Sequence, residues 1–113
     1  MKENFEAVDP ETVLEKVAAM PIQRWNYIGE ETPHIGPVAQ DFHAAFAVGM
    51  NEKTISMVDA DGVALAAIQG LNQKLEQKAK RVNELEQKNR ELEERLKRIE
   101  ALLAEQARSG GNL

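Results

Sequence analysis

Two histidines and a nearby aspartate, His34, His43 and Asp41, are residue types that could bind a metal ion. Their spacing follows no recognised ligand pattern, and isolated histidines are more often hydrogen-bonded surface residues. The run Asp59-Ala60-Asp61-Gly62 carries the first ligands of a calcium loop but lacks the remaining ligands and the terminal glutamate. A helix N-cap explains this run better. The sequence therefore predicts no metal site and no cofactor.

Nucleophilic side chains are also scarce. The chain has no cysteine, and its serines are Ser56 and Ser109. Ser56 falls in a predicted strand and Ser109 in a predicted C-terminal tail, and neither has an obvious histidine or lysine partner in the sequence. We therefore predict no complete nucleophile assembly within these residues.

The element that organises the chain is a predicted helix over residues 62–107. Its apolar residues recur at alternating spacings of three and four, which is the period of a coiled coil. The predicted a and d positions of the seam include Ile68, Leu71, Leu75, Val82, Leu85, Asn89, Leu92, Leu96, Ile99 and Leu103. Such a helix would be about 70 Å long, and it cannot lie buried in a monomer of this size.

Two polar residues interrupt this seam, Lys78 at a d position and Asn89 at an a position. Buried polar residues can fix the register and the number of chains at a cost in stability. For Lys78 the alternative is that its side chain extends out of the seam toward water. The sequence leaves both interpretations open.

The residues that flank the seam indicate how the helices associate. Basic residues occupy g positions and acidic residues occupy e positions, so parallel chains in register bring opposite charges together. The predicted interchain pairs are Arg81 with Glu86, Lys88 with Glu93, and Arg95 with Glu100. Each exposed pair contributes about 0.2–1 kcal/mol, whereas each buried apolar side chain contributes about 1.5–3 kcal/mol. The charges therefore select a parallel arrangement that the apolar seam drives.

Residues 1–61 form a predicted α+β head that begins with a short helix. Asp9 is its N-cap and Pro10 its first residue, and the helix should stop before Pro21. The elements that follow are a strand over 22–28, a helix over 38–46 that ends near Gly49, and a strand over 54–58. Asp59 or Asp61 should then cap the long helix.

A head of this size buries only about 60% of its unfolded surface, so we expect it to dock on the start of the long helix or on a neighbouring chain. Gly70 is either the place where the head packs or a tolerated glycine that costs about 1 kcal/mol. At the other end, residues 108–113 have no periodicity and are predicted to be a disordered tail.

The charge is uneven along the chain. Residues 1–61 hold four basic and eleven acidic residues, a net charge of −7, and residues 62–113 hold ten and eight, a net charge of +2, which together give −5. An acidic head with no basic region before the heptads argues against a nucleic-acid partner. The N-terminus lacks the apolar core of a signal peptide, and no run approaches the roughly 18–20 apolar residues of a membrane span. Neither nucleic acid nor a membrane is expected as a partner.

Three segments, in this order and followed by a long coiled coil, give the sequence a family resemblance. They are Lys2-Glu3-Asn4-Phe5, His34-Ile35-Gly36-Pro37-Val38-Ala39-Gln40-Asp41 and Val58-Asp59-Ala60-Asp61-Gly62-Val63-Ala64-Leu65. Over residues 2–75 the chain resembles the endosialidase-type intramolecular chaperone domain. This is the self-cleaving C-terminal domain of many phage tailspikes and tail fibres, and it also occurs in myelin regulatory factor. The motif residues on which the resemblance rests include His34, Gly36, Gln40, Asp41 and Asp59.

The resemblance implies a homotrimer that helps an upstream β-rich fibre or spike to assemble in register and is then released. Release would use a Ser-Lys dyad, in which the lysine is the general base for a serine that attacks the preceding peptide carbonyl. Lys2 matches the dyad lysine. The serine would precede Lys2 and is absent from these residues, so the chain as given is expected to be inactive. For phage members, the resemblance implies a virion precursor made in the bacterial cytoplasm.

The sequence thus predicts a small α+β head followed by a long helix that forms a parallel homotrimeric coiled coil. Its partners would be copies of itself and the upstream part of the same precursor. The alternative is a plain oligomerisation module that does not cleave. The heptads leave dimer and trimer open, because leucine and isoleucine are mixed over both core positions and Asn89 suits either number. The resemblance favours three chains.

Overall fold

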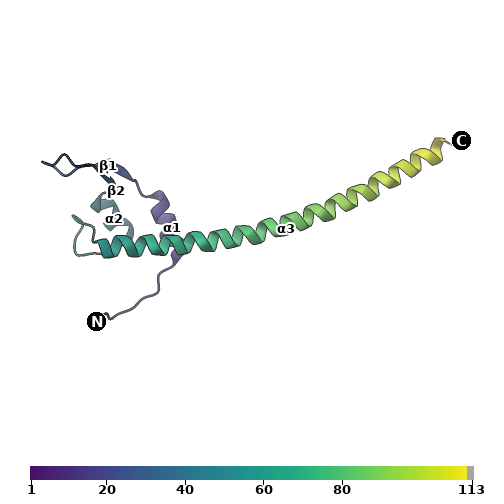
Figure 1. Cartoon of the computed structure of the whole chain (residues 1–113). Helices are drawn as coiled ribbons and strands as arrows, with labels where there is room; N and C mark the ends of the chain where they lie inside the picture. The colour runs from purple at the N-terminus through teal and green to yellow at the C-terminus, as the bar shows by residue number, and fades with distance from the viewer. Residues whose placement is uncertain (112–113) are drawn as a thin grey trace. The chain divides into compact units, whose positions relative to one another are not determined.

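The computed structural model describes residues 1–111, which fall into two compact units, Met1–Lys74 and Leu75–Leu113 (Figure 1). The elements of the chain are α1 (Pro10–Ala19), β1 (Gln23–Trp25), β2 (His34–Gly36), α2 (Ala39–Phe46) and α3 (Met57–Gly111). The N-terminal unit, Met1–Lys74, contains the first four elements and the beginning of α3. The prediction of a small head with short helices and strands, followed by one long helix, is confirmed.

Helix α1 begins as its sequence predicts. The Asp9 carboxylate accepts hydrogen bonds from the backbone N–H of Glu11 at 3.2 Å and from the Thr12 hydroxyl at 2.7 Å. Pro10 is the first helical residue, where its missing N–H costs nothing. The helix ends at Ala19, and Met20 is extended ahead of Pro21.

The sheet is an antiparallel pair in which Gln23 lies opposite Gly36 and Trp25 lies opposite His34. The strand predicted over residues 22–28 is therefore shorter than expected, and its partner β2 was not predicted. Gly29, with a φ of 87°, lies in the turn between the strands. The pair is held by the Trp25 indole N–H, which donates to the Gly36 carbonyl at 3.2 Å.

The strand predicted over residues 54–58 is wrong. The Asn51 side chain accepts from the backbone N–H groups of Lys53 and Thr54 at 2.9 and 3.1 Å, and this closes a turn instead. The backbone carbonyl of Ser56 then accepts from the Ala60 N–H at 2.9 Å, so α3 begins at Met57, before the predicted start.

Because α3 begins at Met57, Asp59 and Asp61 lie inside its first turns, and the prediction that one of them is the N-cap is also wrong. They remain favourable there, since acidic side chains near a helix N-terminus interact well with its dipole. At its other end α3 continues through the predicted tail as far as Gly111. Residues 112–113 of that tail lie outside the described residues.

Helix α2 ends at Phe46, as the sequence predicts, but Gly49 is not the residue that ends it. Ala47, and not Gly49, adopts the left-handed conformation, with a φ of 50°, and its N–H donates to the His43 carbonyl at 2.8 Å. Among the described residues, the buried apolar side chains are Phe42 of α2, Val13 of α1 and Ala67 of α3. The core of the N-terminal unit therefore lies where these three helices meet, and it is small.

Candidate oligomerisation surface

The heptad side chains of α3 are exposed to solvent in the single chain. The apolar a and d residues from Ile68 to Leu103 keep between 42% and 62% of their surface accessible. They are Ile68, Leu71, Leu75, Val82, Leu85, Leu92, Leu96, Ile99 and Leu103. An apolar stripe of this length, with nothing covering it, is typical of a protein interaction surface.

Within the N-terminal unit, α1 and α2 cover a different face of α3 from the one that carries these residues. Ala67, at a g position, is only 8% exposed, and Gly70, at a c position, is buried. A side-chain carbon added to Gly70 would overlap the Pro10 carbonyl and lie 3.0 Å from the Leu14 Cβ. Gly70 is therefore a packing site, which decides the question that the sequence leaves open. The a and d positions remain accessible beside it.

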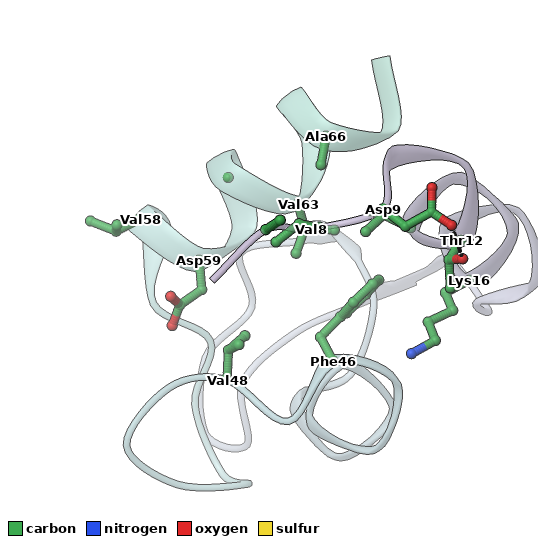
Figure 2. A pocket seen from close by; sticks show the side chains of 13 residues that line it. Val8, Asp9, Thr12, Lys16, Phe46, Val48, Val58, Asp59, Val63 and Ala66 are labelled. Atoms are coloured by element: carbon green, nitrogen blue, oxygen red, sulfur yellow. Dashed lines mark hydrogen bonds between the residues drawn. The ribbon is translucent and has the colours of Figure 1, made fainter. Parts of the chain in front are cut away.

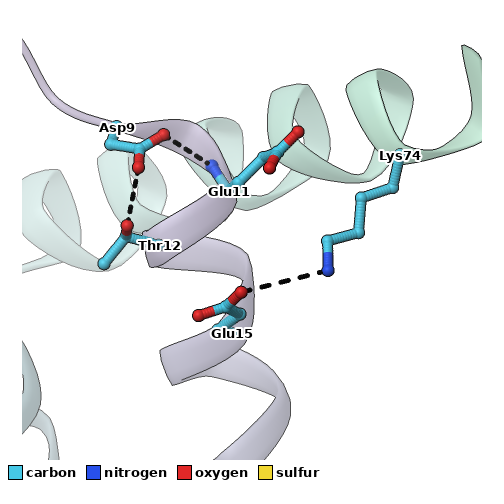
Figure 3. A network of polar contacts seen from close by, with 5 residues as sticks. All are labelled: Asp9, Glu11, Thr12, Glu15 and Lys74. Carbon is cyan, nitrogen blue, oxygen red and sulfur yellow. Dashed lines mark hydrogen bonds and ion pairs between the residues drawn. The ribbon is translucent and has the colours of Figure 1, made fainter. Parts of the chain in front are cut away.

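Polar contacts fix the start of α1 and join it to α3. Figure 3 shows the Asp9 carboxylate between the Glu11 N–H and the Thr12 hydroxyl, and the Glu15 side chain reaching toward Lys74. The Lys74 ammonium lies 4.0 Å from the Glu15 carboxylate. Both side chains are substantially exposed, so this pair orients α1 more than it stabilises the unit.

The charged residues that flank the seam have few partners in the single chain. Arg81 lies 3.3 Å from Glu84, three residues further along the same helix. The structure shows no ion pair within residues 1–111 for the other predicted pairing residues, which are Glu86, Lys88, Glu93, Arg95 and Glu100. These side chains are all exposed and free to meet charges on another chain.

Lys2 lies in the segment that precedes α1 and is exposed. It forms no hydrogen bond or ion pair with any residue that the structure describes. Ser56, one of the chain's two serines, contributes its backbone carbonyl to the start of α3. Within residues 1–111, Lys2 therefore contacts no serine for which it could act as a general base.

The motif residues of the central segment build the hairpin and the start of α2. The His34 ring lies 5.2 Å from the Trp25 ring and 5.4 Å from the Tyr27 ring, while Gly36 supplies the carbonyl that binds the indole. Gln40 and Asp41 are exposed in the first turn of α2, and Asp59 lies half-buried in the first turn of α3. The structure gives His34 and Gly36 a structural role in the hairpin, and it does not gather the five motif residues into one site.

Metal binding finds no support in the arrangement of these side chains. Among residues 1–111, no group of three or more histidine, aspartate or glutamate side chains is placed to hold a metal ion. His34 is part of the aromatic cluster, and the Nδ1 atom of His43 is buried without a hydrogen-bond partner. Asp59 and Asp61 are helical, so they cannot wrap around a calcium ion as a loop does.

An apolar pocket of about 530 Å³ lies between α1, α2 and the start of α3. Figure 2 shows Val63 and Ala66 of α3 on one side of it and Phe46 and Val48 on the other, with Val8 between them. The Lys16 side chain lies at the edge of the pocket, and its ammonium donates a hydrogen bond to the Ala45 carbonyl at 2.9 Å. The residues that line this pocket include no serine or histidine, so we assign it a role in side-chain packing and none in nucleophilic catalysis.

Sequence reasoning missed two exposed apolar residues at the start of α3, Val58 and Leu65, which lie outside the a and d positions. The signal that could have found them is their e position, which holds glutamate at Glu86, Glu93 and Glu100. No helix of the described chain combines the length and apolar character that crossing a membrane requires.

Comparison with known proteins bears on the N-terminal unit. A family model described as "Chaperone of endosialidase" matches residues 1–50. Neither the curated proteins nor the solved structures include a significant match to this chain. The matched region contains α1, the hairpin and α2, together with Lys2 and the central motif from His34 to Asp41. In these first fifty residues, the chain is similar to the endosialidase chaperone family.

Proposed function

We propose that this chain is a C-terminal intramolecular chaperone that assembles as a parallel homotrimer and thereby aligns an upstream fibre or spike protein. The observation that carries the proposal is the exposed heptad stripe of α3, which has no cover in the single chain. The family match supplies the chaperone role. The number of chains, their orientation and the release step are the parts that we propose.

Burial of the stripe provides the driving force for assembly. Each large apolar side chain that leaves water contributes about 1.5–3 kcal/mol, and nine such residues per chain occupy the seam. The flanking charges, at about 0.2–1 kcal/mol for each exposed pair, are too weak to drive association. They distinguish parallel from antiparallel helices, because only the parallel arrangement places Arg81, Lys88 and Arg95 beside acidic residues.

Trimerisation would serve the upstream protein by proximity. Three parallel helices hold three chain segments close together in the same register, so the attached β-structure no longer finds its partners by free diffusion. Registration matters for such a structure because β-strands are sensitive to a slip of one residue. A domain that aligns the chains need contribute nothing to the finished fibre.

Release would follow assembly by the Ser-Lys reaction that the family resemblance implies. A serine before Lys2 in the precursor would attack the peptide carbonyl that precedes it, with the Lys2 amine as the general base.

Two measurements test the proposal. Sedimentation equilibrium over a range of concentrations should give three times the mass of the chain at every concentration, and a monomer would refute the heptad argument. A dimer would favour the plain oligomerisation module. For release, the chain is produced with its native preceding residues, and Lys2→Ala should abolish the appearance of a free C-terminal fragment that begins at the upstream serine. The matched control is Lys80→Ala, another exposed lysine, at an outward f position of α3, which should leave cleavage unchanged. If the parent protein is not cleaved, the plain oligomerisation module is the remaining explanation.

A further inference from the structure

Near the start of α3, exposed apolar side chains occupy heptad positions that differ from those of the later seam. Asp61 occupies an a position there, so the apolar seam does not continue toward Met57. Besides Met57 at a d position, the large exposed apolar residues there are Val58 and Leu65, at e positions, which are 76% and 63% accessible. Farther along the helix the same position holds Glu86, Glu93 and Glu100. A flank that is acidic in the middle of the coiled coil is thus apolar at the start of α3.

In a parallel coiled coil the e position of one helix faces the g position of its neighbour, five residues earlier in sequence. Leu65 would therefore face Ala60 of the next copy. Along this g side, α3 is not open to solvent, because Ala60 is half-buried, Ala67 is buried and Lys74 pairs with Glu15. The residues before α3 thus line the side of the helix toward which a neighbouring Leu65 points.

A second apolar pocket, of about 590 Å³, opens beside Ala60. Its apolar lining comes from the hairpin, from the start of α2 and from the segment that leads into α3, and includes Trp25, Ile35, Val38, Ile55 and Met57. Trp25 and Tyr27, whose rings contact each other edge to face, form one of its walls. The pocket has the apolar chemistry and the position to receive a leucine.

We propose that residues 1–56 of one copy dock on α3 of the next copy, with Leu65 of the second copy entering the pocket beside Ala60 of the first. The inference rests on the proposed parallel oligomer, because the heptad pairing sets which residues meet. A second copy is the occupant that this pairing brings to the pocket. Each set of hairpin and short helices would then be held by two copies of α3.

The test uses two substitutions that place the same charge at the same heptad position. Leu65→Glu puts a carboxylate where the pocket would receive it, whereas Ala79→Glu introduces one at an e position two heptads later. Leu and Glu have similar helix propensities, and Leu65 is exposed in the single chain, so neither change disturbs the fold of an isolated copy. Trp25 is the sole tryptophan and lines the pocket, so its fluorescence reports on the pocket directly.

Leu65→Glu should shift Trp25 emission to longer wavelength and lower the midpoint of the fluorescence-detected thermal transition by at least about 5 °C. Leu65→Ala should produce a smaller change in the same direction, and Ala79→Glu should match the parent chain. Sedimentation equilibrium on the same samples separates the two proposals. An oligomeric parent whose Leu65→Glu and Ala79→Glu variants give identical Trp25 signals would overturn the docking inference and leave the chaperone proposal standing. A monomeric parent would remove the basis of both.

Discussion

Because α1 contacts α3 at Gly70, we expect alanine substitutions at two glycines of α3, Gly62 and Gly70, to change stability in opposite directions. In an exposed helix interior, replacing glycine by alanine stabilises by about 0.5–1 kcal/mol, because glycine loses more backbone freedom on folding. Gly62 has no atom within 4 Å of the position its side-chain carbon would occupy, so Gly62→Ala should bring this gain.

At Gly70 the same methyl group would overlap the carbonyl group of Pro10 and contact Leu14. Pro10 is the first residue of α1, and its carbonyl is backbone, so it cannot rotate away as a side chain would. Overpacking of this kind costs about 1–3 kcal/mol, which exceeds the propensity gain of about 1 kcal/mol. We expect Gly70→Ala to destabilise the N-terminal unit by up to about 2 kcal/mol in net terms.

The assay is urea unfolding followed by Trp25 fluorescence, which reports on the N-terminal unit. All variants are compared at one protein concentration, because the stability of an oligomer depends on it. The midpoint should rise for Gly62→Ala and fall for Gly70→Ala. A Gly70→Ala variant as stable as Gly62→Ala would show that α1 does not pack on α3 at this point.

Two further predictions concern the helix cap and the seam. Asp9→Ala should cost about 1 kcal/mol in urea unfolding, because it removes the acceptor for the Glu11 N–H, while Asp9→Asn should retain most of the stability; equal losses for both variants would contradict a capping role. Asn89→Leu should raise the thermal midpoint of the oligomer and broaden the distribution of masses in sedimentation, because a buried polar a residue gives specificity at the expense of stability. A sharper mass distribution after Asn89→Leu would refute its role in fixing the assembly.

The local signals in the sequence predicted what depends on neighbours along the chain. Asp9 followed by Pro10 defines the start of α1 through contacts within three residues, and the structure has them. The helical character of residues 62–107 follows from a period that repeats along the segment. These features need no knowledge of the rest of the fold.

Non-local contacts account for the errors. His34–Gly36 is a strand only because it pairs with Gln23–Trp25 and accepts the Trp25 indole N–H, and its own composition carries little strand signal. Residues 54–58 have the apolar and β-branched composition of a strand, but the Asn51 turn and the start of α3 override that preference. Propensity loses to tertiary structure in both places.

The candidate oligomerisation surface also has one part that the sequence predicts and another that only the structure shows. The a and d residues are visible in the sequence as a heptad, and the structure shows them exposed. The importance of Leu65 depends on which side of α3 is covered, and this follows only from the burial of Ala67 and the close approach at Gly70. A residue that acts through the shape of a neighbouring surface leaves no periodic signal.

The small core of the N-terminal unit links its folding to assembly. With Val13, Phe42 and Ala67 as its buried apolar side chains, the described unit gains little stability from its own interior. Its other support is α3, which carries an exposed apolar stripe. Anything that binds the folded state and not the unfolded one stabilises folding, and in the proposed assembly the binding partners would be copies of the same chain. Under that proposal, the unit completes its fold when the chains have met in register, which is the point at which an assembly chaperone should act.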